Sequence, residues 1–133
     1  DQFDGRAALS DDLDADGRVD LLVVEDRWTD GQILHVYRNT MENSGNWIGI
    51  RLRDVPDKPS PIGARVTVAA GGVKHIGQYV TGETIHGQHA PTLHFGLGEA
   101  ESVESIEITW PNGGGTRKIE SPAVNQYHDV TAP

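Results

Sequence analysis

Apolar and polar residues alternate along most of this chain, and that alternation restricts the fold more than any other feature. Every second side chain on a strand points to the same face, so such a segment is predicted to be a β-strand with one buried and one solvent-exposed face. No segment shows the apolar stripe of a helix. We therefore predict an all-β chain, built as an antiparallel β-sandwich or a barrel-like domain. The alternation is found in residues 48–52, 62–68, 93–97 and 106–110.

Turn-forming residues separate several of these segments. Gly71-Gly72 lies between residues 62–70 and 73–80, which predicts a β-hairpin. The run Pro111-Asn112-Gly113-Gly114 predicts a second turn, after which residues 116–120 return as a strand beside the preceding one.

An acidic loop near the beginning of the chain carries the clearest chemical signal. Four carboxylates at this spacing repel one another, and oxygen ligands of this kind are those that Ca²⁺ prefers. We predict that Ca²⁺ is bound by the side chains of Asp12, Asp14, Asp16 and Asp20 and by the carbonyl oxygen of Arg18. Gly17 permits the positive φ that turns the loop. The acidic loop reads Asp12-Leu13-Asp14-Ala15-Asp16-Gly17-Arg18-Val19-Asp20.

This loop is not an EF-hand. The twelfth position counted from Asp12 is Val23, where an EF-hand has a bidentate glutamate. The residues that follow, Leu21 to Val24, favour a strand and not a helix. A second strand is predicted at 33–38, and a two-strand unit is marginal alone, so it must pack on the rest of the chain or on neighbours. We expect the ion to be structural, because Ca²⁺ polarises its ligands only weakly.

Composition excludes several classes of function. Among the 133 residues, 20 are acidic and 11 are basic, which gives a net charge of −9 and makes nucleic acids and anionic membranes improbable partners. The chain has no cysteine, so disulfides and thiolate metal sites are excluded. No apolar stretch is long enough for membrane insertion. Loops of this type suit extracellular calcium, so we expect a secreted or periplasmic protein, as a mature form or a trimmed piece of a longer chain.

Several motifs also resemble known families. Residues 12–24 followed by Leu34-His35-Val36-Tyr37-Arg38-Asn39 resemble the end of an FG-GAP/VCBS repeat, the calcium-bearing blade of integrin-α-type β-propellers. The later motifs, in order and spacing, resemble the ASPIC/UnbV domain that ends cartilage acidic protein and many bacterial secreted proteins. These later motifs are Asn46-Trp47-Ile48-Gly49-Ile50-Arg51-Leu52, Ile62-Gly63-Ala64-Arg65-Val66, Leu93-His94-Phe95-Gly96-Leu97-Gly98 and Trp110-Pro111-Asn112-Gly113.

The resemblance implies two parts and a non-catalytic role. Residues 1–42 would be the last, partial propeller blade with its calcium loop, and residues 43–133 would be an ASPIC/UnbV-like β domain. The family relation further implies an extracellular module that binds or adheres to another protein or a glycan. The run from Glu83 to Gln88 departs from the family pattern, so a ligand bound at that loop would differ from the family's.

Two other hypotheses rest on single loops. Trp28, flanked by acids and amides, would suit the stacking of a sugar, and with the loop at 83–89 it would make a carbohydrate-binding accessory domain. Trp28 would equally fit beneath a neighbouring propeller blade.

His86 and His89 are three residues apart and could chelate zinc in a metallohydrolase, although two surface histidines in a polar loop would give the same pattern. No nucleophile motif is present, and we predict that the protein is not an enzyme.

Overall fold

The computed structural model describes residues 4–27, 31–42, 44–83 and 87–133. Ten β-strands and no helix lie within these residues, which confirms the predicted all-β class. This part of the chain also contains no helix with the length and apolarity that crossing a membrane requires.

The chain divides into two compact units. The first unit consists of residues 1–42 together with residues 81–90, and the second unit consists of residues 43–80 and 91–133. The short segment 81–90 thus groups with the beginning of the chain, although in sequence it lies between the two parts of the second unit. Each unit has its own sheets, and they are described separately below.

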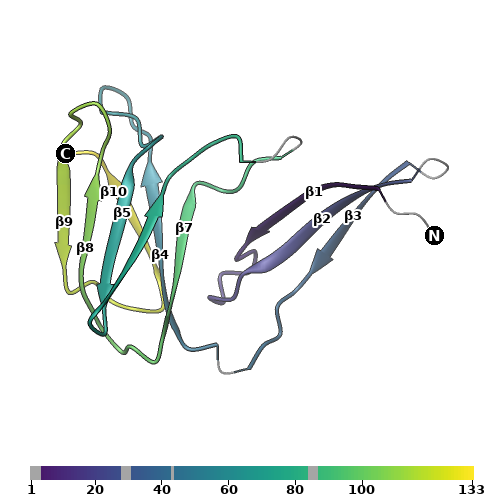
Figure 1. Ribbon diagram of the computed structural model, residues 1–133, viewed down its shortest axis with the longest axis horizontal. Helices are drawn as coiled ribbons and strands as arrows, with labels where there is room; N and C mark the ends of the chain where they lie inside the picture. The colour runs from purple at the N-terminus through teal and green to yellow at the C-terminus, as the bar shows by residue number, and fades with distance from the viewer. Residues whose placement is uncertain (1–3, 28–30, 43, 84–86) are drawn as a thin grey trace. The chain divides into compact units, whose positions relative to one another are not determined.

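The first unit is a three-stranded antiparallel sheet in which β2 lies between β1 and β3. Strands β2 and β3 correspond to the two that the sequence predicts, whereas β1 was not predicted. Because β1 ends where the acidic loop begins and β2 starts where it ends, the loop is the connection of a hairpin (Figure 1). The three strands are β1 (Asp4–Asp11), β2 (Asp20–Arg27) and β3 (Gly31–Tyr37).

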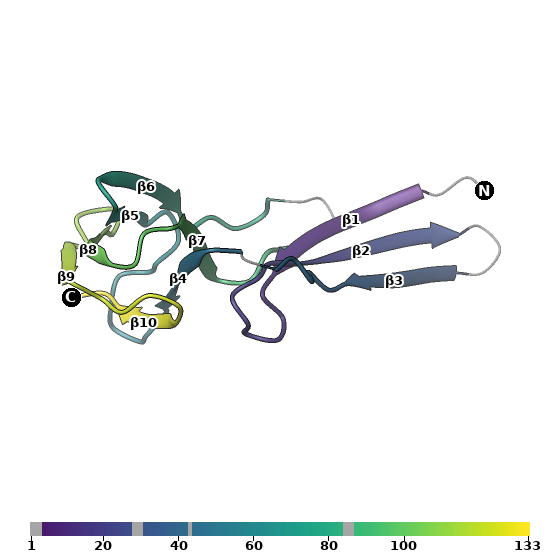
Figure 2. The same cartoon turned by 90° about the horizontal axis from the view of Figure 1, so that it is seen from below.

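The second unit contains two sheets, one of three strands in the order β10-β4-β7 and one of four strands in the order β6-β5-β8-β9. Figure 2 shows them as separate layers. Neighbouring strands are antiparallel except for β4 and β10, which are parallel. The strands are β4 (Asn46–Arg53), β5 (Arg65–Ala70), β6 (Val73–Gln78), β7 (Thr92–Gly98), β8 (Val103–Thr109), β9 (Thr116–Glu120) and β10 (Tyr127–Thr131).

The inward faces of these two sheets share one apolar core. Alternate residues of β4, β5 and β8 point into it, as the period-two pattern predicts. Two layers joined by such a core form a β-sandwich, and the described strands do not close into a barrel. The predicted sandwich is therefore confirmed. The largest fully buried side chains are those of Ile48, Ile50, Val66, Val68, Ile106 and Ile108.

Both predicted turns are present. Gly71 and Gly72 join β5 to β6 with φ angles of +56° and +76°. Positive φ at both central residues is what a tight turn between twisted strands requires. Asn112 and Gly113 also have positive φ and lie between β8 and β9, which pair in antiparallel fashion as expected.

Candidate metal centre

The acidic loop brings three carboxylates together at the end of the sheet of the first unit. Pairing of Asp11 with Asp20 closes the hairpin and thereby fixes the two ends of the loop. One carboxylate oxygen from each of Asp12, Asp14 and Asp20 lies within 4.8 Å of the others. Asp12 and Asp20 are only 7% and 5% exposed, whereas Asp14 faces solvent.

Backbone amides hold the two buried carboxylates in place. The oxygens of Asp12 accept hydrogen bonds from the amides of Asp16 at 3.0 Å and of Gly17 at 2.8 Å. The second of these bonds depends on the turn at Gly17, whose φ is +88°. Asp20 accepts one bond from the amide of Leu13 at 3.2 Å. The loop therefore wraps around these side chains and fixes their orientation.

Asp16 is turned toward arginines and is not a member of the three-carboxylate cluster. Its Oδ1 accepts a hydrogen bond of 2.9 Å from the amide of Arg18, and its Oδ2 pairs with the guanidinium groups of Arg18 and Arg38. The amide of Arg18, together with Arg38, lowers the pKa of Asp16 below its ordinary value. The guanidinium of Arg18 also donates to the carbonyl oxygen of Asn39 at 2.9 Å.

Two residues that directly follow β3, Arg38 and Asn39, contact the loop and were not predicted to do so. Arg38 lies with Nη2 2.7 Å from Oδ2 of Asp14, and hydrogen bonding to Asp16 together with the charge of Asp14 raises the pKa of Arg38. The amide of Asn39 donates to Asp20 at 2.8 Å. The signal that could have found them is the register of β2 and β3, because Leu21 lies opposite Tyr37 and the next residues then reach the loop.

The donor chemistry of the cluster fits a hard cation. Ca²⁺ binds oxygen at about 2.3–2.6 Å, so two oxygens on the same ion lie at most about 5 Å apart. The separation of no more than 4.8 Å between the oxygens of Asp12, Asp14 and Asp20 satisfies this limit without movement of the strands. Calcium and magnesium prefer carboxylate oxygens as ligands, whereas zinc and copper favour thiolates and imidazoles.

The remaining predicted site residues lie elsewhere or outside the description. Trp28 and His86 are both outside the described residues. His89 belongs to the first unit, where its Nδ1 lies 3.4 Å from the amide nitrogen and 3.3 Å from the carbonyl oxygen of Ser10. His89 thus links the segment 81–90 to strand β1.

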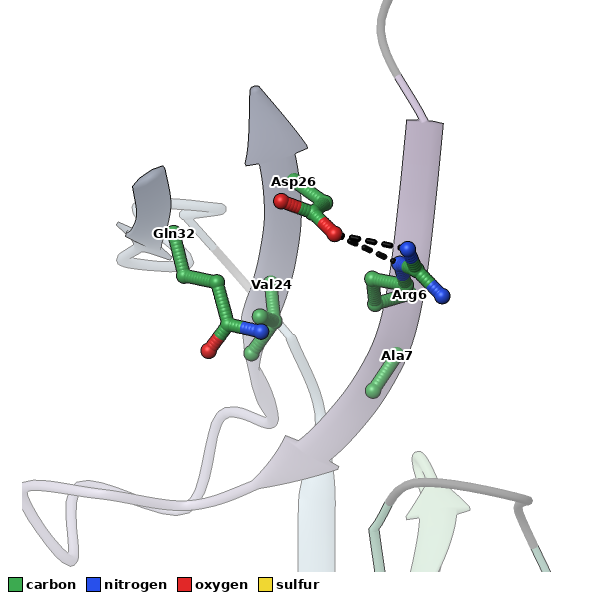
Figure 3. Close-up of a pocket in the computed structure, with 5 residues that line it drawn as sticks. All are labelled: Arg6, Ala7, Val24, Asp26 and Gln32. Carbon is green, nitrogen blue, oxygen red and sulfur yellow. Dashed lines mark hydrogen bonds and ion pairs between the residues drawn. The ribbon is translucent and has the colours of Figure 1, made fainter. Parts of the chain in front are cut away.

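The sheet of the first unit also has a hollow of about 490 Å³ on one face. Figure 3 shows that Arg6 and Asp26 reach toward each other across neighbouring strands, and two nitrogens of the guanidinium lie 2.7 and 3.0 Å from Oδ2 of Asp26. Among the described residues that line it, the two titratable groups, Arg6 and Asp26, are thus joined in an ion pair. Its lining residues are Arg6, Ala7, Val24, Asp26 and Gln32.

Comparison with known protein families gives a match over the larger part of the chain. The model of the family described as ASPIC and UnbV matches residues 55–133, which is more than half of the chain and confirms that predicted resemblance. No curated protein matches the chain. The family match begins after the acidic loop, so the resemblance of residues 12–39 to an FG-GAP/VCBS repeat stays a prediction.

Proposed function

The chain belongs to the ASPIC and UnbV family, and on that premise we propose that it is a non-catalytic binding module in which Ca²⁺ stabilises the first unit. The observation that carries this proposal is the approach of Asp12, Asp14 and Asp20 to within 4.8 Å. Two carboxylates this close repel by about 3 kcal/mol at an effective dielectric constant of about 20. A divalent cation among them converts that repulsion into attraction.

The residues around the cluster support a structural role for the ion. Asp12 and Asp20 would bind it from the two ends of the loop, and Asp14 would bind from the solvent side. Because Asp20 is also bonded to the amide of Asn39, an ion held there would tie β3 to the connection between β1 and β2. The ion would supply a fixed positive charge and hold the ends of β1, β2 and β3 together.

The first unit has reason to need such support. A three-stranded sheet has little interior, and several of its apolar side chains are solvent-exposed within the described chain, including Leu34 and Val36 at 59% and 57%. Little apolar area is thus available to stabilise the sheet. Ion binding to the folded form alone would stabilise it by about 2.7 kcal/mol when calcium is at about 100 times its dissociation constant.

The proposed setting is extracellular or periplasmic, where calcium is abundant enough for a solvent-exposed loop with few protein ligands. The proposed partner is an extracellular protein or a glycan. The net charge of −9 agrees with this, since it disfavours nucleic acid and anionic lipid. No contact among the described residues favours the carbohydrate-binding or the metallohydrolase hypothesis, because Trp28 and His86 lie outside them.

The test is calcium titration of the purified chain by isothermal titration calorimetry, combined with differential scanning calorimetry in EGTA and in millimolar CaCl₂. We expect one ion per chain and a higher melting temperature with calcium. Asp14→Asn should weaken binding at least about tenfold, since it removes a charged ligand while leaving the buried carboxylates in place. Asp26→Asn is the matched control, because Asp26 lies on the same sheet but pairs with Arg6.

An absence of binding heat, with the same melting temperature in EGTA and calcium, would contradict the proposal. Equal weakening by Asp14→Asn and Asp26→Asn would also contradict it, because the ion would then respond to net charge alone.

A further inference from the structure

The guanidinium of Arg38 occupies the solvent side of the acidic loop. Its Nη2 lies 2.7 Å from Oδ2 of Asp14 and 3.3 Å from Oδ2 of Asp16. The side chain is nevertheless 62% exposed, and it reaches the loop from the residue that directly follows β3. The positive charge of Arg38 therefore lies against Asp14, one of the carboxylates proposed to bind calcium.

We propose that Arg38 is a tethered counter-ion that competes with calcium for Asp14 and so sets the affinity of the loop. This inference rests on the proposed calcium function. A carboxylate oxygen that accepts a hydrogen bond from a guanidinium has less charge to offer an ion, and a cation bound by Asp14 repels a guanidinium beside it. Calcium binding then releases Arg38 from Asp14 into solvent.

The neighbouring arginine does not share this property. Arg18 is only 27% exposed, and its guanidinium is held both by Asp16 and by the carbonyl oxygen of Asn39. Moving it would break a hydrogen bond to the backbone, whereas the exposed ion pairs of Arg38 within the described chain are with the carboxylates of Asp14 and Asp16. Exposed ion pairs of this kind are weak and screened, so Arg38 can exchange with a divalent cation at small cost.

Two consequences follow for the loop. In the absence of calcium, Arg38 partly neutralises Asp14 and Asp16, so the loop keeps its conformation instead of being driven apart by repulsion. In the presence of calcium, the loss of the Arg38 pair weakens binding. The dissociation constant for calcium is thereby raised, so the loop fills only at high calcium concentrations. The stability of the first unit becomes less dependent on the ion.

The test compares Arg38→Gln with Arg6→Gln. Both variants remove one positive charge and one exposed arginine from the first unit, but Arg38 pairs with Asp14 and Asp16 in the loop, whereas Arg6 pairs with Asp26 outside it. We expect calcium titration calorimetry to show a dissociation constant about two- to fivefold lower in Arg38→Gln, as the worth of one exposed pair implies, and unchanged in Arg6→Gln. Arg38→Lys, which keeps the charge, should stay close to the unsubstituted chain.

Melting temperatures provide the second measurement. The difference between the values in calcium and in EGTA should be larger for Arg38→Gln than for the unsubstituted chain, because only the ion-free loop loses its counter-ion. Equal dissociation constants and equal melting-temperature differences in the unsubstituted chain, Arg38→Gln and Arg6→Gln would overturn the role of Arg38 while leaving calcium binding intact. If neither the unsubstituted chain nor Arg38→Gln binds calcium, this inference and the proposed function both fail.

Discussion

The amide of Asn39 donates a hydrogen bond of 2.8 Å to Oδ1 of Asp20, and this bond joins the end of β3 to the last carboxylate of the acidic loop. The other oxygen of Asp20 accepts from the amide of Leu13 at 3.2 Å. Asp20 is 5% exposed, so both of its oxygens are used in the interior of the hairpin. The same side chain therefore has a structural role that does not depend on an ion.

Asp20→Asn should destabilise the first unit even in EGTA. An asparagine can accept from only one of the two amides, because its other terminal atom is a donor. These two hydrogen bonds are partly buried, so an amide left without its acceptor there should cost about 1 kcal/mol, the lower end of the range for buried groups. We expect a loss of that size in urea unfolding followed by far-UV circular dichroism in EGTA.

The control for this prediction is Asp14→Asn, which makes the same chemical change in the same loop. Asp14 is exposed and its pair with Arg38 is screened, so its loss should change the free energy of unfolding in EGTA by less than about 0.5 kcal/mol. Equal stabilities of the two variants in EGTA would show that the amides of Leu13 and Asn39 do not depend on Asp20.

A second prediction concerns Gly49, which lies beneath the ring of Tyr127 on the outer face of the sheet β10-β4-β7. A Cβ added at Gly49 would overlap Cδ1 and Cε1 of that ring. The ring cannot easily move, since the ring of Trp47 lies 4.9 Å away between centroids and the guanidinium carbon of Arg51 lies 3.9 Å from its centroid. Gly49→Ala should therefore lower the free energy of unfolding by about 1–3 kcal/mol in denaturant titrations.

Gly96→Ala on the adjacent strand β7 is the matched control. Gly96 lies opposite Trp47 in the register of the sheet, and an added Cβ there meets no atom within 4 Å. It should be neutral or stabilise the sandwich by up to about 1 kcal/mol, because alanine has fewer unfolded conformations than glycine. If both substitutions cost the same, the loss at Gly49 would come from glycine replacement itself and not from Tyr127.

Alternation of residue types predicted the strands that have one side in the core. β4, β7 and β8 each place apolar residues at every second position, and their faces are buried as expected. β1 and β10 could not be predicted in this way. β1 has the sequence DGRAALSD, with few residues that favour strands, and β10 buries Val130 while its neighbours are polar or aromatic. Both are edge strands, where one neighbour suffices to define the pairing.

The acidic loop illustrates the same limit for the candidate site. Spacing along the chain predicted that Asp12, Asp14 and Asp20 lie together, because residues of one tight loop are close in sequence, and their carboxylates do lie together. It could not distinguish them from Asp16, because the direction of that side chain depends on Arg18 and Arg38. The contacts of Arg38 arise from pairing between β2 and β3, which sequence spacing alone does not define.

The last prediction concerns Asn125, which begins the parallel pairing of β10 with β4. Its Oδ1 accepts from the amide of Trp47 at 3.0 Å, its own amide donates to the carbonyl oxygen of Trp47 at 2.7 Å, and its Nδ2 donates to Oδ1 of Asn46 at 2.8 Å. Asn125 has a φ of +58°, which asparagine tolerates better than most residues. Asn125→Ala would therefore lose two side-chain hydrogen bonds. It would also place at this positive φ a residue that tolerates it less well than asparagine.

Asn112 separates these two effects, because its φ of +54° is similar and it lies in the exposed turn between β8 and β9. Asn112→Ala should cost only the backbone preference, whereas Asn125→Ala should cost about 1–3 kcal/mol more, since the amide of the buried Trp47 loses its acceptor. Differential scanning calorimetry of both variants measures the difference. Similar losses would mean that the side chain of Asn125 contributes nothing to the start of β10, and that backbone pairing with β4 alone determines the parallel register.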